Sequence, residues 1–330
     1  MARIVLGLGS SHSPMLNMQP DEWPGYEERE RAGNIPLLNR EGQAVAFDEL
    51  VATADPRVTG YINPAERVQR HRRTEAAITR LGTVIDRAAL DALIVVGDDQ
   101  FELFDRSNLP AMLIYCGQTI RNAPFEDHDQ RPDFLLRAYQ RNCEKSGVRD
   151  YPVAETLARH LVETLIEHEF DVATANILPP GIGEGHAFGF VHKRLMLGTV
   201  VPIVPVMLNT YYPPNQPSPR RCYRLGQAFA AAARSFPGDA RVGIMASGGL
   251  SHFVIDEELD QIVIAALRAK DAAALQALPR ERLNAGSSEI RNWICVAGAA
   301  EHLTLDWLDY VPCYRTPAGT GTAMCFASWS

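Results

Sequence analysis

The sequence predicts an α/β fold: a single compact domain with a central mixed sheet flanked by helices. Short apolar runs rich in β-branched residues recur along the chain, and segments with helical apolar periodicity separate them. Runs that are apolar almost without interruption are typical of strands covered on both faces of a sheet. No stretch rich in Pro, Gly or Ser divides the 330 residues, so one domain over residues 1–330 is expected.

Taken in order, the expected elements alternate between strand and helix. Strands are expected at residues 3–7, 92–97, 111–115, 172–176, 200–208 and 241–247. Helices are expected at residues 64–85, 153–170, 223–234 and 257–275. Asn63 is the expected cap of the first helix, because its side chain can accept an unpaired N–H, and Pro64 suits the first helical position.

Two segments fall outside this alternation. Residues 15–60 mix Pro, Gly, Trp and both charges without a sustained period, which indicates an irregular N-terminal excursion beside the sheet. Long ordered insertions of this kind often form a wall of a site or a subunit contact. Residues 314–321 are expected as a loop, either one that closes over a ligand or a simple terminal turn.

Composition and charge exclude several classes of protein. Hydrophobic residues make up 46% and charged residues 22%, which excludes disordered, collagen-like and coiled-coil proteins. The formal charge of -8, from 40 acidic against 32 basic residues, argues against a nucleic-acid surface, because phosphate binding needs a clustered basic face. No membrane span is expected, since the most apolar stretch, residues 200–208, is far shorter than the about 20 residues required.

The cysteines and the N-terminal sequence indicate the cellular compartment in which the protein is expected. The six cysteines lack C-x-x-C spacing and are therefore expected to be free thiols in a reducing environment. The apolar run at the N-terminus is too short for the core of a signal sequence. We therefore expect a cytoplasmic protein.

Candidate functional side chains lie on loops that follow expected strands, where an open α/β sheet binds its ligands. His12 is held on a short loop between a glycine and a proline, which suits a metal ligand or a general base; a capping role is the alternative. His252 follows a Gly-Gly pair that lets the backbone pass close to a ligand. Gly249 and Ser251 of that loop are expected to contact substrate.

A second loop, after residues 92–97, is rich in oxygen donors. Asp98, Asp99, Gln100 and Glu102 fall within five residues, and such a cluster suits a hard or borderline cation. The alternative is an ordinary acidic turn in which Asp98 or Asp99 caps a helix.

Two further candidates lie later in the chain. His186 follows a glycine-rich segment that indicates a loop open to a site. Glu289 falls at the third position of a helix if Gly286 caps it, where a carboxylate is favoured for capping alone. The other histidines are expected to be structural in the case of His192 and on the surface in the case of His71, His128, His160, His168 and His302.

Together these segments resemble one known superfamily, the class III extradiol ring-cleavage dioxygenases. This is the superfamily of the protocatechuate 4,5-dioxygenase β subunit and of gallate and 3-O-methylgallate dioxygenases. The resemblance covers most of the chain and rests on the order of its segments. These are residues 11–14, 95–100, 185–186, 209–223 with Gly226, 247–252 and 288–289 with Trp293.

The resemblance implies a non-haem Fe(II) centre held by two histidines and one glutamate, with no organic cofactor. His12 matches the first ligand and Glu289 the carboxylate. The second family histidine belongs to an Asp-His pair, and this chain has Asp99-Gln100 there. Gln100 is therefore the first candidate for the third ligand and Glu102 the second, with a takeover by Asp98 or Asp99 also open.

The same resemblance implies roles for two histidines. His252 matches the catalytic acid/base, and His186 matches the histidine that contacts substrate or oxygen. Independently of the resemblance, Arg291 is expected to contact substrate, although the sequence does not rank it above the other arginines in segments near the site, Arg220, Arg221 and Arg315.

The expected activity is extradiol cleavage of a catechol- or gallate-type ring with incorporation of O2. The expected partners are a small aromatic diol, O2 and a second copy of the chain in a homo-oligomer, most simply a dimer. The replacement at Gln100 keeps one alternative open, a related metal-dependent hydrolase or decarboxylase acting on a hydroxylated aromatic compound.

Overall fold

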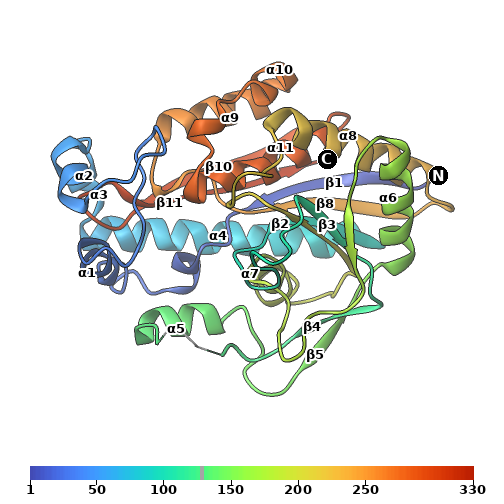
Figure 1. The fold of residues 1–330 in the computed structure, drawn as a ribbon, viewed down its shortest axis with the longest axis horizontal. Helices are drawn as coiled ribbons and strands as arrows, with labels where there is room; N and C mark the ends of the chain where they lie inside the picture. Colours follow the sequence, from blue (N-terminus) through green and yellow to red (C-terminus); the bar gives the residue numbers. More distant parts are fainter. Residues whose placement is uncertain (127–129) are drawn as a thin grey trace.

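A computed structural model describes residues 1–126 and 130–330, so that His128 lies outside the described residues. The expected α/β architecture is confirmed: a large mixed sheet lies between two layers of helices (Figure 1). Its strand order is β10-β11-β1-β8-β2-β7-β3-β6, and β9 pairs with β11. A separate two-stranded sheet is formed by β4 (Thr119–Asn122) and β5 (Arg149–Pro152).

The expected strands all form. They are β1 (Arg3–Ser10), β2 (Ala92–Asp98), β3 (Met112–Tyr115), β6 (Ala173–Ala175), β7 (Ile203–Leu208) and β8 (Arg241–Ser247). Their apolar character reflects burial on both sides of the sheet. Along β2, Ile94 and Val96 enter one core cluster, while Leu93 and Val95 enter the other. Because side chains alternate along a strand, one continuous apolar run packs into the cores on both faces of the sheet.

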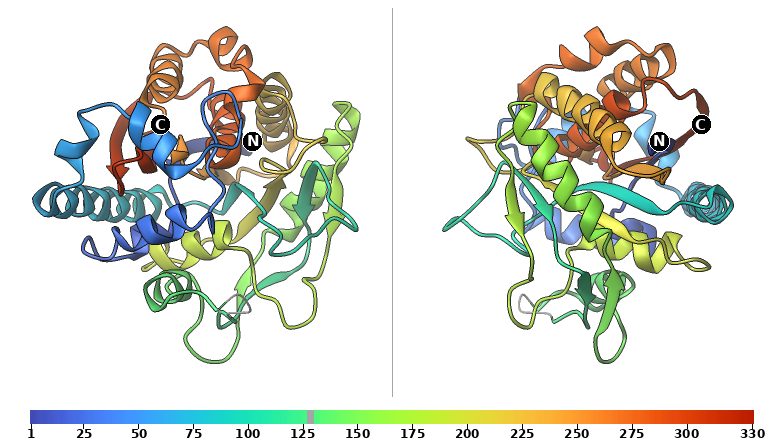
Figure 2. Two further views of the ribbon diagram at one scale, coloured as in Figure 1. Left: turned by 60° about the vertical axis from the view of Figure 1, so that its left-hand side comes forward. Right: turned by 90° about the vertical axis from the view of Figure 1, so that its right-hand side faces the viewer.

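Helices cover both faces of this sheet (Figure 1). One face packs against α6 (Glu155–Glu167), α8 (Pro219–Ser235), α9 (Glu257–Ala269) and α11 (Ile290–Ala299). The other packs against α4 (Pro64–Ala88) and α7 (His186–Phe190). A further layer beyond α7, made of α5 (Asp133–Gln140) and the β4-β5 sheet, lies at the bottom of each view in Figure 2.

Local signals explain where these helices begin and end. Asn63 caps α4 as expected, because its side chain accepts the N–H of Glu66. The expected single helix at residues 257–275 is wrong, since Lys270 adopts a left-handed conformation with φ 53° and ends α9. Asp271 then caps a new helix, α10 (Ala272–Gln276).

The N-terminal excursion is more ordered than its sequence indicates. Residues 15–60 contain three short helices, α1 (Gly25–Arg31), α2 (Phe47–Thr53) and α3 (Val58–Tyr61), besides the single turn η1 (Pro14–Asn17). Each is too short to show a helical period in the sequence. Buried Met15, Leu16 and Trp23 fasten the segment to the α4 side of the sheet.

The C-terminal hairpin is an element that the sequence analysis missed. It consists of β10 (Leu305–Tyr314) and β11 (Thr320–Trp329), and β11 pairs antiparallel with β1, which extends the sheet. The expected loop at residues 314–321 is the turn of this hairpin, so the simpler of the two interpretations is confirmed. The short strand β9 (His252–Val254) pairs with the end of β11 beside that turn.

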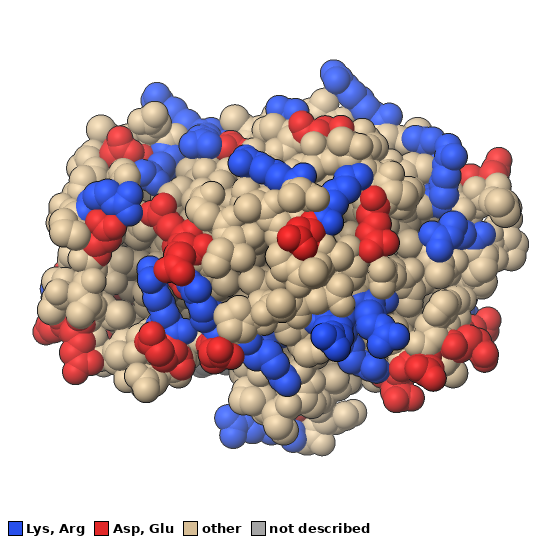
Figure 3. All heavy atoms as spheres, turned by 90° about the horizontal axis from the view of Figure 1, so that it is seen from above, with Lys and Arg blue, Asp and Glu red and all other residues tan. Residues whose placement is uncertain are grey.

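Three further features are the charge of the surface, the hydropathy of the helices and the state of the cysteines. On the face shown in Figure 3, Lys and Arg side chains alternate with Asp and Glu. No helix within the described residues combines the length and the apolar character that a membrane crossing requires. The six cysteines are free thiols, as expected.

Parallel pairing sets the position of the candidate loops. β1, β8 and β2 are adjacent and parallel, with Ser10 opposite Ser247 and Val96 opposite Ala246. Their carboxyl ends therefore lie at one edge of the sheet. The loops that carry His12, the acidic cluster and His252 all start from that edge.

Candidate metal centre and active site

His12 is buried just beyond the end of β1, and its tautomer can be derived from its partners. Its Nδ1 lies 3.0 Å from Oγ of Ser247. That hydroxyl donates its own proton to the carbonyl oxygen of Ala187, at 2.7 Å, so it must accept from Nδ1–H of His12. Nε2 of His12 is then the unprotonated nitrogen, and it points to the centre of the site.

His186 opens α7 and approaches His12 from the other side. Oε2 of Glu102 lies 2.6 Å from its Nδ1, and Oε1 accepts its backbone N–H at 2.9 Å. Nε2 of His186 lies 3.2 Å from Nε2 of His12. Burial lowers the pKa of His186, but the charge and hydrogen bond of Glu102, with the charges of Asp98 and Glu289, raise it to about 10. The surroundings therefore favour positive charge at this point.

Asp98 ends β2 and is almost fully buried. Its Oδ2 accepts from Nε2 of Gln100 at 3.2 Å, while Oδ1 lies 3.7 Å from Nε2 of His12. Among the described residues, Oδ1 has no hydrogen-bond partner. Burial, with the charge of Glu289, raises the pKa of Asp98 to about 6. A buried carboxylate oxygen without a donor is costly unless a cation meets it.

Glu289 lies where the 3₁₀ turn η4 (Ala285–Glu289) meets α11. The capping interpretation is wrong, because the Glu289 side chain makes no capping hydrogen bond and its carboxylate turns into the site. Its Oε2 accepts the N–H of Gly249 at 2.7 Å and lies 3.3 Å from Nε2 of His12; Oε1 accepts the hydroxyl of Tyr211 at 2.6 Å. Burial raises its pKa, but His252 and His12 outweigh burial and hold the pKa well below its usual value.

His252 stands on the far side of Glu289. Its Nδ1 lies 2.8 Å from the carbonyl oxygen of Leu250, which can only accept, so Nδ1 carries a proton. Nε2 lies 3.1 Å from Oε1 of Glu289 and 3.5 Å from the hydroxyl of Tyr211. Burial lowers the pKa of His252, and the nearby carboxylate of Glu289 more than reverses that effect.

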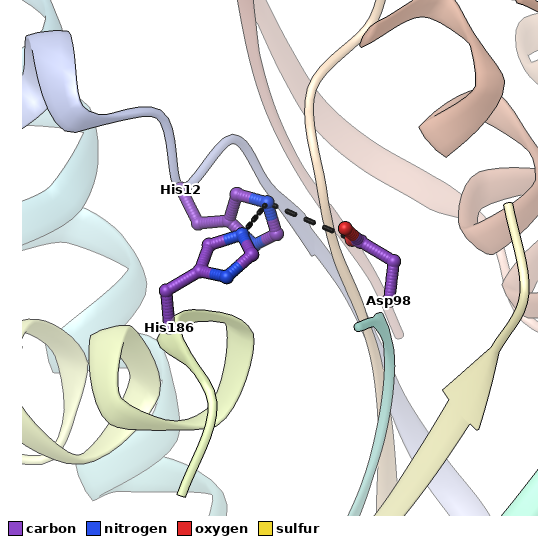
Figure 4. Close-up of side chains that lie close together, drawn as sticks. All are labelled: His12, Asp98 and His186. Carbon is purple, nitrogen blue, oxygen red and sulfur yellow. Dashed lines mark hydrogen bonds and ion pairs between the residues drawn. The ribbon is translucent and has the colours of Figure 1, made fainter. Parts of the chain in front are cut away.

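These side chains form a group that suits a metal ion. His12, Asp98 and His186 each offer one ligand atom, and the three atoms lie within 4.8 Å of one another (Figure 4). Two imidazoles and a carboxylate are the donor set that non-haem Fe(II) oxygenases use. The partnerless oxygen of Asp98 is the observation that favours a cation there. The residues present therefore fit a divalent metal centre.

The polar residues of the acidic loop after β2 have different roles, which the sequence did not show. Asp99 accepts the backbone N–H groups of Leu103 and Phe104, so it stabilises the turn. Glu102 holds His186, and Gln100 lines the cavity while its amide group donates to Asp98.

The three residues expected to contact substrate occupy other positions. Gly249 donates to Glu289, and the hydroxyl of Ser251 donates to Asp260 at 2.6 Å. Arg291 is buried, and its guanidinium donates to backbone carbonyl oxygens, including those of Pro217 and Leu283. Within the described residues, the lining of the cavity includes none of these three. Their bonds instead support the loops that carry Glu289 and His252.

A cavity of about 360 Å³ opens onto His12, His186, His252 and Glu289. The N-terminal excursion forms one of its other walls, which is one of the two roles expected for that segment, and the region around α5 forms another, which the sequence did not connect with the site. Aromatic and basic side chains dominate these walls: Tyr26, Phe125, Tyr139, Tyr211 and Phe253, with Arg29, Arg131 and Arg315. Two of these residues had a signal in the sequence: Tyr211 lies in a segment that carries the family resemblance, and Arg315 is one of the four arginines expected near the site.

Comparison with known proteins gives a family match and a partial match to a curated protein. A family model described as "Catalytic LigB subunit of aromatic ring-opening dioxygenase" matches residues 56–324, which is most of the chain. Over 120 residues, the chain is 35% identical to the gallate dioxygenase of Pseudomonas putida. That similarity covers 34% of each protein, so the chain aligns with about a third of the length of this curated relative.

The tautomer of His12 is tested by the variant Ser247→Ala. Without the hydroxyl, Nδ1–H of His12 loses its acceptor, and the ring is no longer held with Nε2 toward the centre. We expect divalent-metal affinity to fall by about 10- to 100-fold, as for other groups that orient a ligand. Competition with a metallochromic chelator measures the affinity. Ser10→Ala, at the neighbouring end of β1, is the matched control, and equal affinities in the two variants would contradict the assignment.

Proposed function

Since the chain belongs to the family of the catalytic LigB subunit of aromatic ring-opening dioxygenases, we propose that it cleaves a catechol- or gallate-type ring with incorporation of O2 and with Fe(II) as its resident metal. The observation that carries the proposal is the convergence of His12, His186, Glu289 and His252 on one aromatic-lined cavity, with Asp98 close behind the two imidazoles of His12 and His186. The similarity to a gallate dioxygenase supports the substrate class. The family resemblance of the segments supports extradiol cleavage, next to the diol.

The proposed ion is held by His12 and Glu289 together with residues of the β2 loop and α7. Fe(II) bound there would anchor both oxygens of a diol and supply the electron transfer that O2 needs to react with an aromatic ring. The protein's own task is to hold the ion, bind the ring beside it and manage protons. The partnerless oxygen of Asp98 and the two inward-facing imidazoles fit the first task.

His252 is the proposed general base. Because Leu250 fixes the proton on Nδ1, Nε2 is the atom available to take a proton from a substrate hydroxyl. Glu289 lies 3.1 Å from Nε2 and stabilises the imidazolium that forms. The same nitrogen can later return the proton to the opening ring. Tyr211 keeps Glu289 in place by donating to Oε1.

The cavity walls suit an aromatic substrate with an anionic substituent. Its volume of about 360 Å³ lies in the range of small-molecule pockets, and ring stacking against Tyr or Phe favours a flat substrate. The charge of Arg315 is neutralised by Glu30, whose Oε1 lies 2.7 Å from Nη2 of Arg315. Arg29 lines the cavity, and its buried Nε has no partner among the described residues. We therefore assign the carboxylate contact to Arg29 in place of Arg291.

The proposal is tested by anaerobic loading with Fe(II), followed by O2-uptake measurements with gallate, protocatechuate and unsubstituted catechol. We expect O2 consumption equal to the diol consumed, because both oxygen atoms enter the opened product. Apo-protein and protein loaded with Zn(II), which has no redox chemistry, are the controls. Stoichiometric iron without O2 uptake on any diol would overturn the proposal. Product formation without O2 would instead identify a hydrolase or decarboxylase.

The role of His252 is tested by His252→Ala. We expect the variant to retain Fe(II), since His252 lies beyond Glu289, and to turn over about 10²- to 10⁴-fold more slowly because the general base is lost. His160→Ala, whose ring bonds to Ser235 away from the cavity, is the matched control. Steady-state O2 uptake measures kcat for both proteins. A kcat near that of the wild type would remove His252 from the mechanism.

A further inference from the structure

The third ligand of the metal centre is not yet assigned, because Gln100 stands where the family resemblance implies a histidine. An amide oxygen is a weaker donor to Fe(II) than an imidazole nitrogen. In the structure, the amide N–H of Gln100 is directed at Oδ2 of Asp98, at 3.2 Å. This contact leaves Oδ1 of Asp98 facing His12. Gln100 thus positions a carboxylate beside the centre.

The two imidazoles at the centre approach each other in an unusual way. The proton of His12 is committed to Ser247 on Nδ1, and the proton of His186 is committed to Glu102 on Nδ1. In the neutral rings, the two Nε2 atoms therefore present lone pairs to each other across 3.2 Å. Two lone pairs at that distance repel unless a proton or a metal ion lies between them, and only a metal ion would also meet the free oxygen of Asp98.

The spacing of the donor atoms fits a shared ion. Ligand atoms at about 2.1 Å from a metal, separated by roughly 90–110°, lie about 3.0–3.5 Å from one another. Nε2 of His12 lies 3.2 Å from Nε2 of His186 and 3.3 Å from Oε2 of Glu289, both within this range, and 3.7 Å from Oδ1 of Asp98, slightly beyond it. The last oxygen has no other partner among the described residues.

We infer that His186, and not Gln100, supplies the second imidazole ligand, and that Asp98 joins it, so that α7 replaces the ligand missing from the β2 loop. The family resemblance assigns the histidine at this position to substrate or oxygen. In this chain His186 is a metal ligand, and His252 carries out the proton transfer. The inference rests on the proposed function only for the identity of the ion.

Glu102 is the positioning residue of this arrangement. Its two carboxylate oxygens accept from the backbone N–H and from Nδ1 of His186, which fixes both the start of α7 and the plane of the ring. A carboxylate on the outer nitrogen of a histidine also strengthens the inner nitrogen as a ligand. A Cβ on Gly185 would lie 2.8 Å from Oε2 of Glu102, so a larger residue there would push this carboxylate out of position.

The test is anaerobic titration of apo-protein with Co(II), a spectroscopic probe for Fe(II) whose visible absorption depends on the ligands. We compare wild type with His186→Ala and Gln100→Ala, and use His12→Ala as the reference for a lost ligand. His186→Ala should lose about 100-fold or more in affinity and change the spectrum, as His12→Ala does. Gln100→Ala should stay within about tenfold of wild type and keep the wild-type spectrum.

Glu102→Gln separates ligand from positioning residue. It should weaken Co(II) binding by about tenfold while the wild-type spectrum returns at saturating metal, because His186 remains able to bind. Circular dichroism checks folding, and His186→Gln replaces His186→Ala if the smaller side chain destabilises α7. Wild-type affinity and spectrum without His186, or a loss in Gln100→Ala as large as in His12→Ala, would overturn the inference.

The Co(II)-binding result can be distinguished from the result of the ring-cleavage test. Co(II) binding is measured without substrate and without O2, so it reports on the ligands alone. A protein that binds metal through His186 yet consumes no O2 with any diol would refute ring cleavage and leave the ligand assignment standing. Ring cleavage with an intact centre in His186→Ala would refute only the ligand assignment.

Discussion

The site depends on the parallel pairing of β1, β8 and β2. With Ser10 opposite Ser247 and Val96 opposite Ala246, three loops that are far apart in sequence leave the sheet at one edge. Backbone hydrogen bonds over whole strands fix that geometry, so a few polar side chains can be buried together at the edge. The close packing of Trp293 against Gly9, where a Cβ would lie 2.4 Å from the indole ring, ties α11 and hence Glu289 to the same edge.

The charge balance at that edge follows from burial. Asp98, Glu289 and Glu102 bring three carboxylates into a region with little solvent, and three imidazoles face them. Each carboxylate has donors except at one oxygen of Asp98, and the inner nitrogens of His12 and His186 face each other. A divalent cation satisfies both features at once, whereas an extra proton satisfies only the imidazole pair. The arrangement is most simply explained as one built around a metal.

Much of the fold follows from the sequence because its strands are continuously apolar and α4 has clear cap signals. The C-terminal hairpin was missed, since β10 mixes exposed and buried positions without a strong apolar run. The end of α9 was missed because Lys270 carries no signal for a left-handed conformation. Position at strand ends made His12 and His252 candidates, glycines before His186 made it another, and the family resemblance changed the expected role of Glu289 from capping to metal binding. The substrate contact expected of Arg291 is not favoured by the structure, which shows its buried guanidinium donating to backbone carbonyl oxygens that the sequence could not indicate.

A crystal structure of the Fe(II)-loaded protein tests the central claim most directly. The crystals are grown without O2, and anomalous scattering at the iron absorption edge locates the iron. The account predicts one iron within about 2.3 Å of Nε2 of His12, Nε2 of His186 and an oxygen of Glu289, with Oδ1 of Asp98 turned toward it. Iron bound through Gln100, with His186 outside bonding distance, would contradict it. So would an iron site elsewhere in the chain.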